Sequence, residues 1–344
     1  MRDLIQELCS PACAGRAPGT PGGLRARGLI RDALRAGGLD PAEQAIGRSR
    51  GANLVATLPG DIDRWVLVAA HYDHLGGDAR RFYPGADDNA AAVAILVDVA
   101  ARLAKERADG RGVIIAAFDA EEPPWFLTGE MGSSWYTKRP TEVGPPLEKI
   151  DLMVCMDLVG HALGPEGLPD SVRGSLFALG AERSEGTSVI VDELARAEEG
   201  LAIRRMDAEI IPPLSDYDAF WKREVPFLFL TCGRSARYHT PEDVPELLDW
   251  EKMKRTAAWL ERLVRRACAR SEERVKFADA RDDRSTLASF VDLVRPLALV
   301  SPLANDALAR AEQLLEHCDA RGRLPVPLAD APSQLVLGLE SALA

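Results

Sequence analysis

A histidine and an aspartate stand two residues apart at the end of an apolar run early in the chain. The run Val-Leu-Val-Ala-Ala covers residues 66–70, and His71, Tyr72 and Asp73 follow it. Side chains two apart on a strand point the same way, so His71 and Asp73 can lie side by side. A metal-binding imidazole usually donates its other ring N–H to a carboxylate. We therefore expect His71 to bind a metal and Asp73 to orient it.

Further metal-binding side chains follow at the ends of later segments. The Gly-Ala-Asp-Asp-Asn sequence at 85–89 precedes an alanine-rich run, and other acids directly follow apolar runs. The candidate ligands are His71, Asp88, Glu122, Asp157 and His239. Two imidazoles and three carboxylates suit zinc, with manganese or cobalt as alternatives. Five ligands are too many for one open catalytic zinc, so we expect two ions that share a carboxylate. Asp88 is the natural bridge.

The adjacent pair Glu121 and Glu122 suggests a division of labour. Adjacent residues that leave a strand point in different directions, so one can bind metal while the other faces the reaction. We expect Glu122 to be the ligand and Glu121 to stay free. A free glutamate beside a metal can take a proton from water and pass it to a departing amine. This arrangement predicts a hydrolase.

The elements that must position these residues alternate between strands and helices. The expected strands cover residues 53–58, 64–70, 112–118, 150–156, 201–206 and 226–230, and the expected helices cover 24–36, 187–198 and a long segment ending near 269. Asn89 is the expected N-cap of a further helix. This alternation predicts an α/β fold, a three-layer sandwich with a mixed, mostly parallel central sheet flanked by helices. The candidate ligands then fall near strand carboxyl ends, where such sheets bind their ligands.

The character of the chain changes near residue 271. We expect a catalytic domain at 1–270 and a helical C-terminal extension at 271–344, with charged helical sequence at 272–284, helices at 287–300 and 303–318, and a proline-rich tail. The extension carries no obvious chemistry. We expect it either to pack on the catalytic domain or to associate copies of the chain into a homo-oligomer.

Composition narrows the classes of partner. The 42 basic and 53 acidic residues give a net charge of −11, which argues against nucleic acid or an anionic membrane surface as the main partner. The six cysteines are scattered, as expected of small buried side chains in a reducing compartment. The start at Met1 has no signal-peptide pattern, and no apolar run approaches the roughly 18 residues of a membrane span. We expect a cytoplasmic protein.

Taken in order, these motifs resemble the dinuclear zinc aminopeptidases, the family of bacterial leucyl aminopeptidases and glutamate carboxypeptidase II. The similarity spans residues 10–269 and includes Gly-Arg-x-Pro-Gly-Thr at 15–20 and His-Tyr-Asp-His-Leu-Gly at 71–76. It implies a zinc-exopeptidase-like fold and hydrolysis of the N-terminal peptide bond of a peptide with a free N-terminus.

The resemblance also implies residue roles. His71 and Asp157 would complete one metal site, Glu122 and His239 the other, with Asp88 as the bridge, Glu121 as general acid/base and Asp73 orienting His71. A cis peptide after Asp88 and a place for Tyr238 near the oxyanion are implied as well. One departure is Ser215-Asp216-Tyr217, where many members have Ser-Asp-His.

Two rival functions share the fold. Glutaminyl cyclases are similar, use one zinc and cyclise N-terminal glutamine, and the Asp-Leu-Val-Gly sequence at 157–160 resembles theirs. The Gly-Ala-Asp-Asp-Asn sequence and Tyr238 look more like the peptidases. The second rival is a non-catalytic scaffold. Such proteins usually lose ligands, whereas all five positions are filled here.

Overall fold

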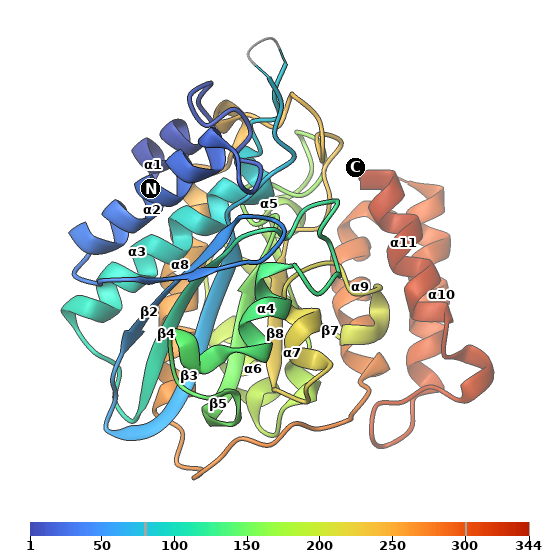
Figure 1. The fold of residues 1–344 in the computed structure, drawn as a ribbon. Helices are drawn as coiled ribbons and strands as arrows, with labels where there is room; N and C mark the ends of the chain where they lie inside the picture. Colours follow the sequence, from blue (N-terminus) through green and yellow to red (C-terminus); the bar gives the residue numbers. More distant parts are fainter. Residues whose placement is uncertain (79–80, 300, 344) are drawn as a thin grey trace.

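The fold is built on one eight-stranded sheet with helices on both faces (Figure 1). A computed structural model describes residues 1–78, 81–299 and 301–343. The strand order is β1-β2-β4-β3-β5-β8-β6-β7. The strands are β1 Ala42–Ala45, β2 Ala52–Leu58, β3 Ile62–His71, β4 Arg111–Phe118, β5 Ile150–Met156, β6 Ser175–Leu179, β7 Ala202–Met206 and β8 Phe227–Thr231. The predicted α/β sandwich with a mixed sheet is confirmed.

The four central strands, β4, β3, β5 and β8, are parallel to one another. They are the apolar runs that the sequence predicts, and sheets buried on both faces need such runs. Their registers bring the strand ends together, because His71 pairs with Phe118 of β4 and Ala70 pairs with Met156 of β5. Residues that follow these strands therefore meet at one edge. The antiparallel pairs lie toward the sides of the sheet.

Two apolar layers fill the space between sheet and helices. Alternate side chains of β3 divide between them: Val66 and Val68 face one layer, and Leu67 and Ala69 face the other. The first layer packs under α1 Arg2–Leu8, α2 Pro21–Ala36, α3 Ala91–Lys105, α6 Thr187–Arg196 and α8 Trp250–Cys268. The second packs under the short helices α4 Gly132–Lys138 and α7 Tyr217–Trp221. These layers fix the strand ends that carry the candidate ligands.

The start of α3 differs from the prediction. The helix begins at Ala91 with Ala90 as its N-cap, and no side chain caps it. Asn89 instead donates from Nδ2 to the Met156 carbonyl, 2.9 Å away. Asn89 is buried and tied to β5 rather than to the helix end, so the expectation that it caps α3 is wrong.

The C-terminal extension contains α9 Asp283–Ala298, α10 Pro302–Glu316 and α11 Ala331–Leu343, which stand together beyond β7 (Figure 1). Leu287, Phe290 and Leu314 belong to their shared apolar core. Most of 272–284 is not helical, so that prediction is wrong, and residue 300 of the predicted helix 287–300 lies outside the described residues. Within 272–282 the chain instead forms an isolated bridge from Phe277 to Ser184 and ion pairs from Asp279 to Arg183 and from Asp282 to Arg205 of β7.

Several elements were missed by sequence reasoning. They are the short strands β1 and β6, the short helices α4, α5 Asp170–Arg173 and α7, and α11. Helix α11 lies in the segment that reads as a proline-rich tail, but Pro332 sits in its first turn, where a missing N–H costs no hydrogen bond. Across the described part of the chain, no helix is both long and apolar enough to cross a membrane.

Candidate metal centre

The predicted ligands meet at the carboxyl edge of the central strands. His71 ends β3, Asp157 directly follows β5, and Glu122 follows β4 by four residues. Asp88 comes from the turn before α3, and His239 comes from the loop after β8. All but His239 are buried, and the His239 side chain is 28% exposed. The sheet topology therefore gathers side chains that are up to 168 positions apart in sequence (71 to 239).

The first group is centred on His71. Its Nε2 lies 3.4 Å from Asp88 Oδ1 and 3.4 Å from Asp157 Oδ1. Zinc–ligand bonds of about 2.1 Å in a tetrahedron place neighbouring ligand atoms about 3.4 Å apart. The His71 contacts have this spacing and are longer than most hydrogen bonds. The three side chains therefore fit one shared ion.

The second group is centred on His239. Its Nε2 lies 3.2 Å from Asp88 Oδ2 and 3.2 Å from Glu122 Oε2. This buried nitrogen has no hydrogen-bond partner of acceptable geometry among the described atoms, although two carboxylate oxygens face it. Asp88 thus turns one oxygen to each histidine, the geometry of a carboxylate shared between two ions.

The charge of this centre also fits cations. Among the described residues, the ion-pair partners of these carboxylates are all histidines. Burial lowers the pKa of His71, but the charges of Glu121 and Asp157 raise it by more, so the net shift is well upward. Burial lowers the pKa of His239 too, and Asp88 and Glu122 bring it up to about 10. A field that holds protons this firmly also favours metal cations.

Glu121 stands beside the first group without joining it. Its Oε2 is 3.9 Å from His71 Nε2, against 3.4 Å for Asp88 and Asp157. Ligand atoms of Glu121, His71 and Asp157 all lie within 4.8 Å of one another. Asp88 is closer to His71 than Glu121 is, and its distance fits two ligands of one ion better. Burial raises the pKa of Glu121 well above its usual range, and nearby carboxylates add to the rise. A carboxylate with a raised pKa is a better proton acceptor.

Asp73 contacts the double glutamate more closely than it contacts His71. Its Oδ1 accepts from the Glu121 amide at 3.0 Å, and its Oδ2 accepts from the Glu122 amide at 3.1 Å. The distance from Asp73 Oδ1 to His71 Nδ1 is 3.6 Å, which is too long for a hydrogen bond. The structure therefore shows Asp73 holding the turn that carries both glutamates, and its role in orienting His71 stays a prediction.

His74 is a contact that the ligand prediction does not include. Its Nδ1 lies 2.7 Å from Glu122 Oε1, while Glu122 Oε2 faces His239. Ligand atoms of His74, Asp88 and Glu122 all lie within 4.8 Å of one another. However, the 2.7 Å between His74 Nδ1 and Glu122 Oε1 is a hydrogen-bond length and is shorter than the distance expected between two ligands of one zinc ion. His74 thus fixes the rotation of the Glu122 carboxylate. The second histidine of His-Tyr-Asp-His was the available signal.

Two further buried side chains hold the loop that carries Asp88. Arg16 donates to the carbonyls of Tyr72 at 2.7 Å, Gly85 at 2.8 Å and Asp88 at 3.2 Å. Asp243 accepts from the amide of Asp88 at 3.1 Å and from that of the preceding residue at 2.8 Å. The peptide after Asp88 is cis, as the family resemblance implied. The Gly-Arg-x-Pro-Gly-Thr run signalled Arg16, and nothing in the sequence singled out Asp243 for this contact.

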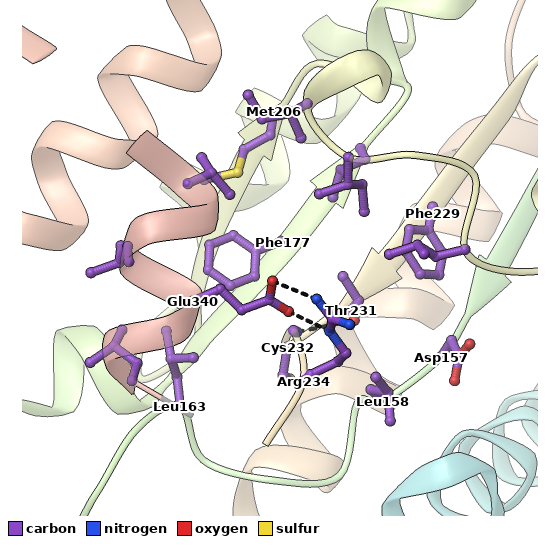
Figure 2. Close-up of a pocket in the computed structure, with 18 of the residues that line it drawn as sticks. Asp157, Leu158, Leu163, Phe177, Met206, Phe229, Thr231, Cys232, Arg234 and Glu340 are labelled. Atoms are coloured by element: carbon purple, nitrogen blue, oxygen red, sulfur yellow. Dashed lines mark hydrogen bonds and ion pairs between the residues drawn. The ribbon is translucent and has the colours of Figure 1, made fainter. Parts of the chain in front are cut away.

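An apolar pocket opens beside the centre (Figure 2). Asp157 and Tyr238 line one end, and leucine, isoleucine, phenylalanine and methionine side chains line most of the rest. Tyr238 is 37% exposed, and its ring stacks on the His239 ring with centroids 3.8 Å apart. Burial raises the pKa of Tyr238, so its hydroxyl stays protonated at neutral pH. It can donate a hydrogen bond there, but a role at the oxyanion stays a prediction.

Fold and site together define an α/β protein of the metal-dependent peptidase class. The chain belongs to peptidase family M28, whose family model matches residues 53–264. This confirms the resemblance drawn from the motifs, and it supports zinc as the metal, because the family is zinc-dependent.

Individual proteins are similar to the chain in sequence or in fold. The chain is 27% identical over 213 residues to the uncharacterized protein YfbL of Escherichia coli, an alignment covering 55% of this chain and 62% of YfbL. The chain spans about half to three fifths of the length of the curated relatives that it matches. Its fold resembles the LapA aminopeptidase of Legionella pneumophila, with a TM-score of 0.63, 15% identity and coverage of 79% and 73% of the two chains. Its fold also resembles glutaminyl cyclase of Porphyromonas gingivalis, with a TM-score of 0.62, 19% identity and coverage of 77% of this chain and 96% of the cyclase.

Proposed function

We propose that this protein is a two-metal aminopeptidase that hydrolyses the N-terminal peptide bond of peptides with a free N-terminus. The observation that carries the proposal is the placement of Asp88, whose two carboxylate oxygens face two different histidines at 3.4 and 3.2 Å. His71 and Asp157 would complete one site, and Glu122 and His239 the other. Zinc fits this donor set, and manganese or cobalt would fit it too.

The bound ions would supply Lewis-acid polarisation of the scissile carbonyl and would lower the pKa of the attacking water. The residues of the chain do the rest. Glu121 accepts the proton of the water at its carboxylate and delivers it to the nitrogen of the departing amine. Asp73 holds the backbone amides of Glu121 and Glu122, so the base and the ligand keep their separate directions. His74 fixes the second oxygen of Glu122.

The test combines metal counting with turnover. Chelated protein reconstituted with zinc should bind two ions per chain and release the amino acid from aminoacyl p-nitroanilides, but not from their N-acetylated forms. Glu121→Gln should keep two ions and lose about 10²–10⁴-fold in kcat, because only the proton acceptor is removed. The exposed Glu106→Gln is the matched control and should change neither quantity.

Three outcomes would contradict parts of the proposal. Unchanged turnover in Glu121→Gln would remove Glu121 as the base. Equal cleavage of the N-acetylated substrates would remove the requirement for a free N-terminus. One tightly bound zinc per chain, with cyclisation of N-terminal glutamine and no amino-acid release, would replace the peptidase with a cyclase, the function that the Asp-Leu-Val-Gly sequence at 157–160 favours.

A further inference from the structure

The far wall of the apolar pocket comes from the C-terminal extension. Helix α11 lines it with Val336, Leu339, Glu340 and Leu343. Their spacing of three, four and seven residues puts them on one face of the helix. Leu337 belongs to another face and is 43% exposed. In Figure 2 this helix stands across the pocket from Asp157, with Phe177 beside the helix and Met206 at the upper end of the pocket. The extension therefore contributes a whole wall to a pocket that begins at a proposed metal ligand.

An ion pair holds this helix to the loop of the metal centre. Arg234 donates from Nε to Glu340 Oε1 at 2.8 Å and from Nη2 to Glu340 Oε2 at 3.0 Å, the two-bond arrangement of arginine and carboxylate (Figure 2). The Arg234 guanidinium also lies 5.9 Å from the Tyr238 ring, which stacks on His239. The position of α11 is thus tied to the segment that carries His239.

The chemistry of the pocket limits what it accepts. Its charged groups are the metal-centre residue Asp157 and the pair Arg234–Glu340, whose charges satisfy each other. A charged side chain placed among the remaining apolar groups would lose its hydration without gaining a partner. The cavity volume is about 120 Å³, several times the roughly 10–15 Å³ that one water needs on the same measure. One large apolar side chain fits such a space.

We infer that the C-terminal extension is part of the substrate site. Helix α11 ends the pocket and sets the length of the apolar N-terminal side chain that the enzyme accepts, and the Arg234–Glu340 pair keeps α11 in that place. The inference rests on the proposed function for the identity of the substrate. It assigns Leu339 and Val336 as specificity-determining residues and Arg234 and Glu340 as positioning residues.

The first test compares two leucines of the same helix. In full-length protein, Leu339→Ala should raise kcat/KM for an N-terminal biphenylalanine anilide relative to the leucine anilide by roughly tenfold or more, the range for small changes in an apolar pocket. Leu339→Trp should shift the ratio the opposite way. Leu337→Ala is the matched control and should leave the ratio unchanged. Equal ratios in all four proteins would overturn the assignment of α11 as the wall.

The second test addresses the ion pair. Arg234→Glu and Glu340→Arg should each relax selectivity between leucine and biphenylalanine substrates, because like charges now push α11 away. Combining both changes reverses the pair and should restore the wild-type ratio. A role limited to folding would lower activity on all substrates equally, and a failure of the double variant to restore selectivity would overturn the positioning role.

A third readout does not depend on peptidase activity. Binding of n-alkylamines from butyl to decyl, measured by calorimetry, should strengthen with chain length and then stop at the length where the alkyl chain meets α11. Leu339→Ala should move this limit to longer chains, and Leu337→Ala should not. If no anilide is cleaved but Leu339→Ala moves the chain-length limit, the proposed function is wrong and the assignment of α11 as the end of the pocket is supported. If anilides are cleaved and the limit does not move, only the assignment of α11 is wrong.

Discussion

The candidate metal centre buries mainly charged side chains, whereas the C-terminal extension buries mainly apolar ones. The centre buries carboxylates whose ion-pair partners, among the described residues, are histidines only. Buried charges are costly unless they are paired, so we expect bound cations to stabilise this region. The extension buries Leu287, Phe290 and Leu314 against one another, and burial of such apolar side chains is stabilising by itself. We therefore expect the two regions to respond to different perturbations.

The largest effect should come from Asp88, the residue that both proposed metal sites would share. Asp88→Asn keeps the shape of the side chain but removes the charge and one anionic oxygen. Both proposed metal sites would lose a ligand at once, so we expect loss of both ions. Because such ions stabilise the transition state by several kcal/mol, turnover should fall by about 10³-fold or more. Metal content and anilide turnover measure this.

A matched control is Asp98→Asn, which removes a partly exposed ion pair with Arg102 on α3. Such pairs contribute about 0–1 kcal/mol, so metal content should not change. If Asp88→Asn retained two ions per chain, the bridging role would be wrong, and each histidine would have to bind its ion with other partners.

The candidate ligands could be grouped from the sequence because most of their signals are local. His71, Glu122 and Asp157 lie at or shortly after the ends of apolar runs, and parallel strands bring such positions to one edge. Contacts that depend on the third dimension were out of reach. Asp243 accepts a hydrogen bond from the Asp88 amide although the two residues are 155 positions apart, and no sequence motif indicates this contact. The same limit explains Asn89, where a bond to β5 replaces the expected cap.

The second prediction asks whether the extension unfolds by itself. Leu287 is fully buried in its core, and Leu287→Ala should cost about 2–5 kcal/mol. Ser289 of α9 donates to the Arg205 carbonyl at 2.7 Å, and Thr286 accepts from the Asp207 amide at 2.9 Å, so α9 is bonded to β7 and the loop after it. We therefore expect one thermal transition at a lower temperature. Leu299→Ala, which alters a leucine that is 86% exposed near the end of α9, should leave the transition where it is.

Two separate transitions, with only one moved by Leu287→Ala, would show instead that 271–344 is an independent domain. That outcome would match the boundary that composition suggests at residue 270. The sequence predicts the helices of this region at 287–300 and 303–318 but not α11, because the prolines that precede α11, its own Pro332 and its small residues are typical of a tail. Helix α11 packs against the apolar core of the extension, and a single sequence does not record that contact.

The smallest effect tests whether every buried carboxylate signals a metal. Glu182 lies near the extension, with Oε1 accepting from the Ala208 amide at 2.9 Å and Oε2 buried without a partner in the described structure. Burial, with Asp207 nearby, raises its pKa to about 8. Between the unfolded pKa near 4.5 and the folded value, the folded state binds more protons, so stability should fall as pH rises.

Glu182→Gln removes this titration and should flatten the slope between about pH 5 and 8, by at most about 1.4 kcal/mol per pH unit. Urea unfolding at several pH values measures it, and the exposed Glu185→Gln should leave the slope unchanged. Added zinc should not alter the difference in slope between the wild type and Glu182→Gln, since Glu182 has Arg183 and a backbone amide as partners instead of imidazoles. A zinc-dependent difference would mean that burial of a carboxylate, without histidines, is enough to bind metal in this fold.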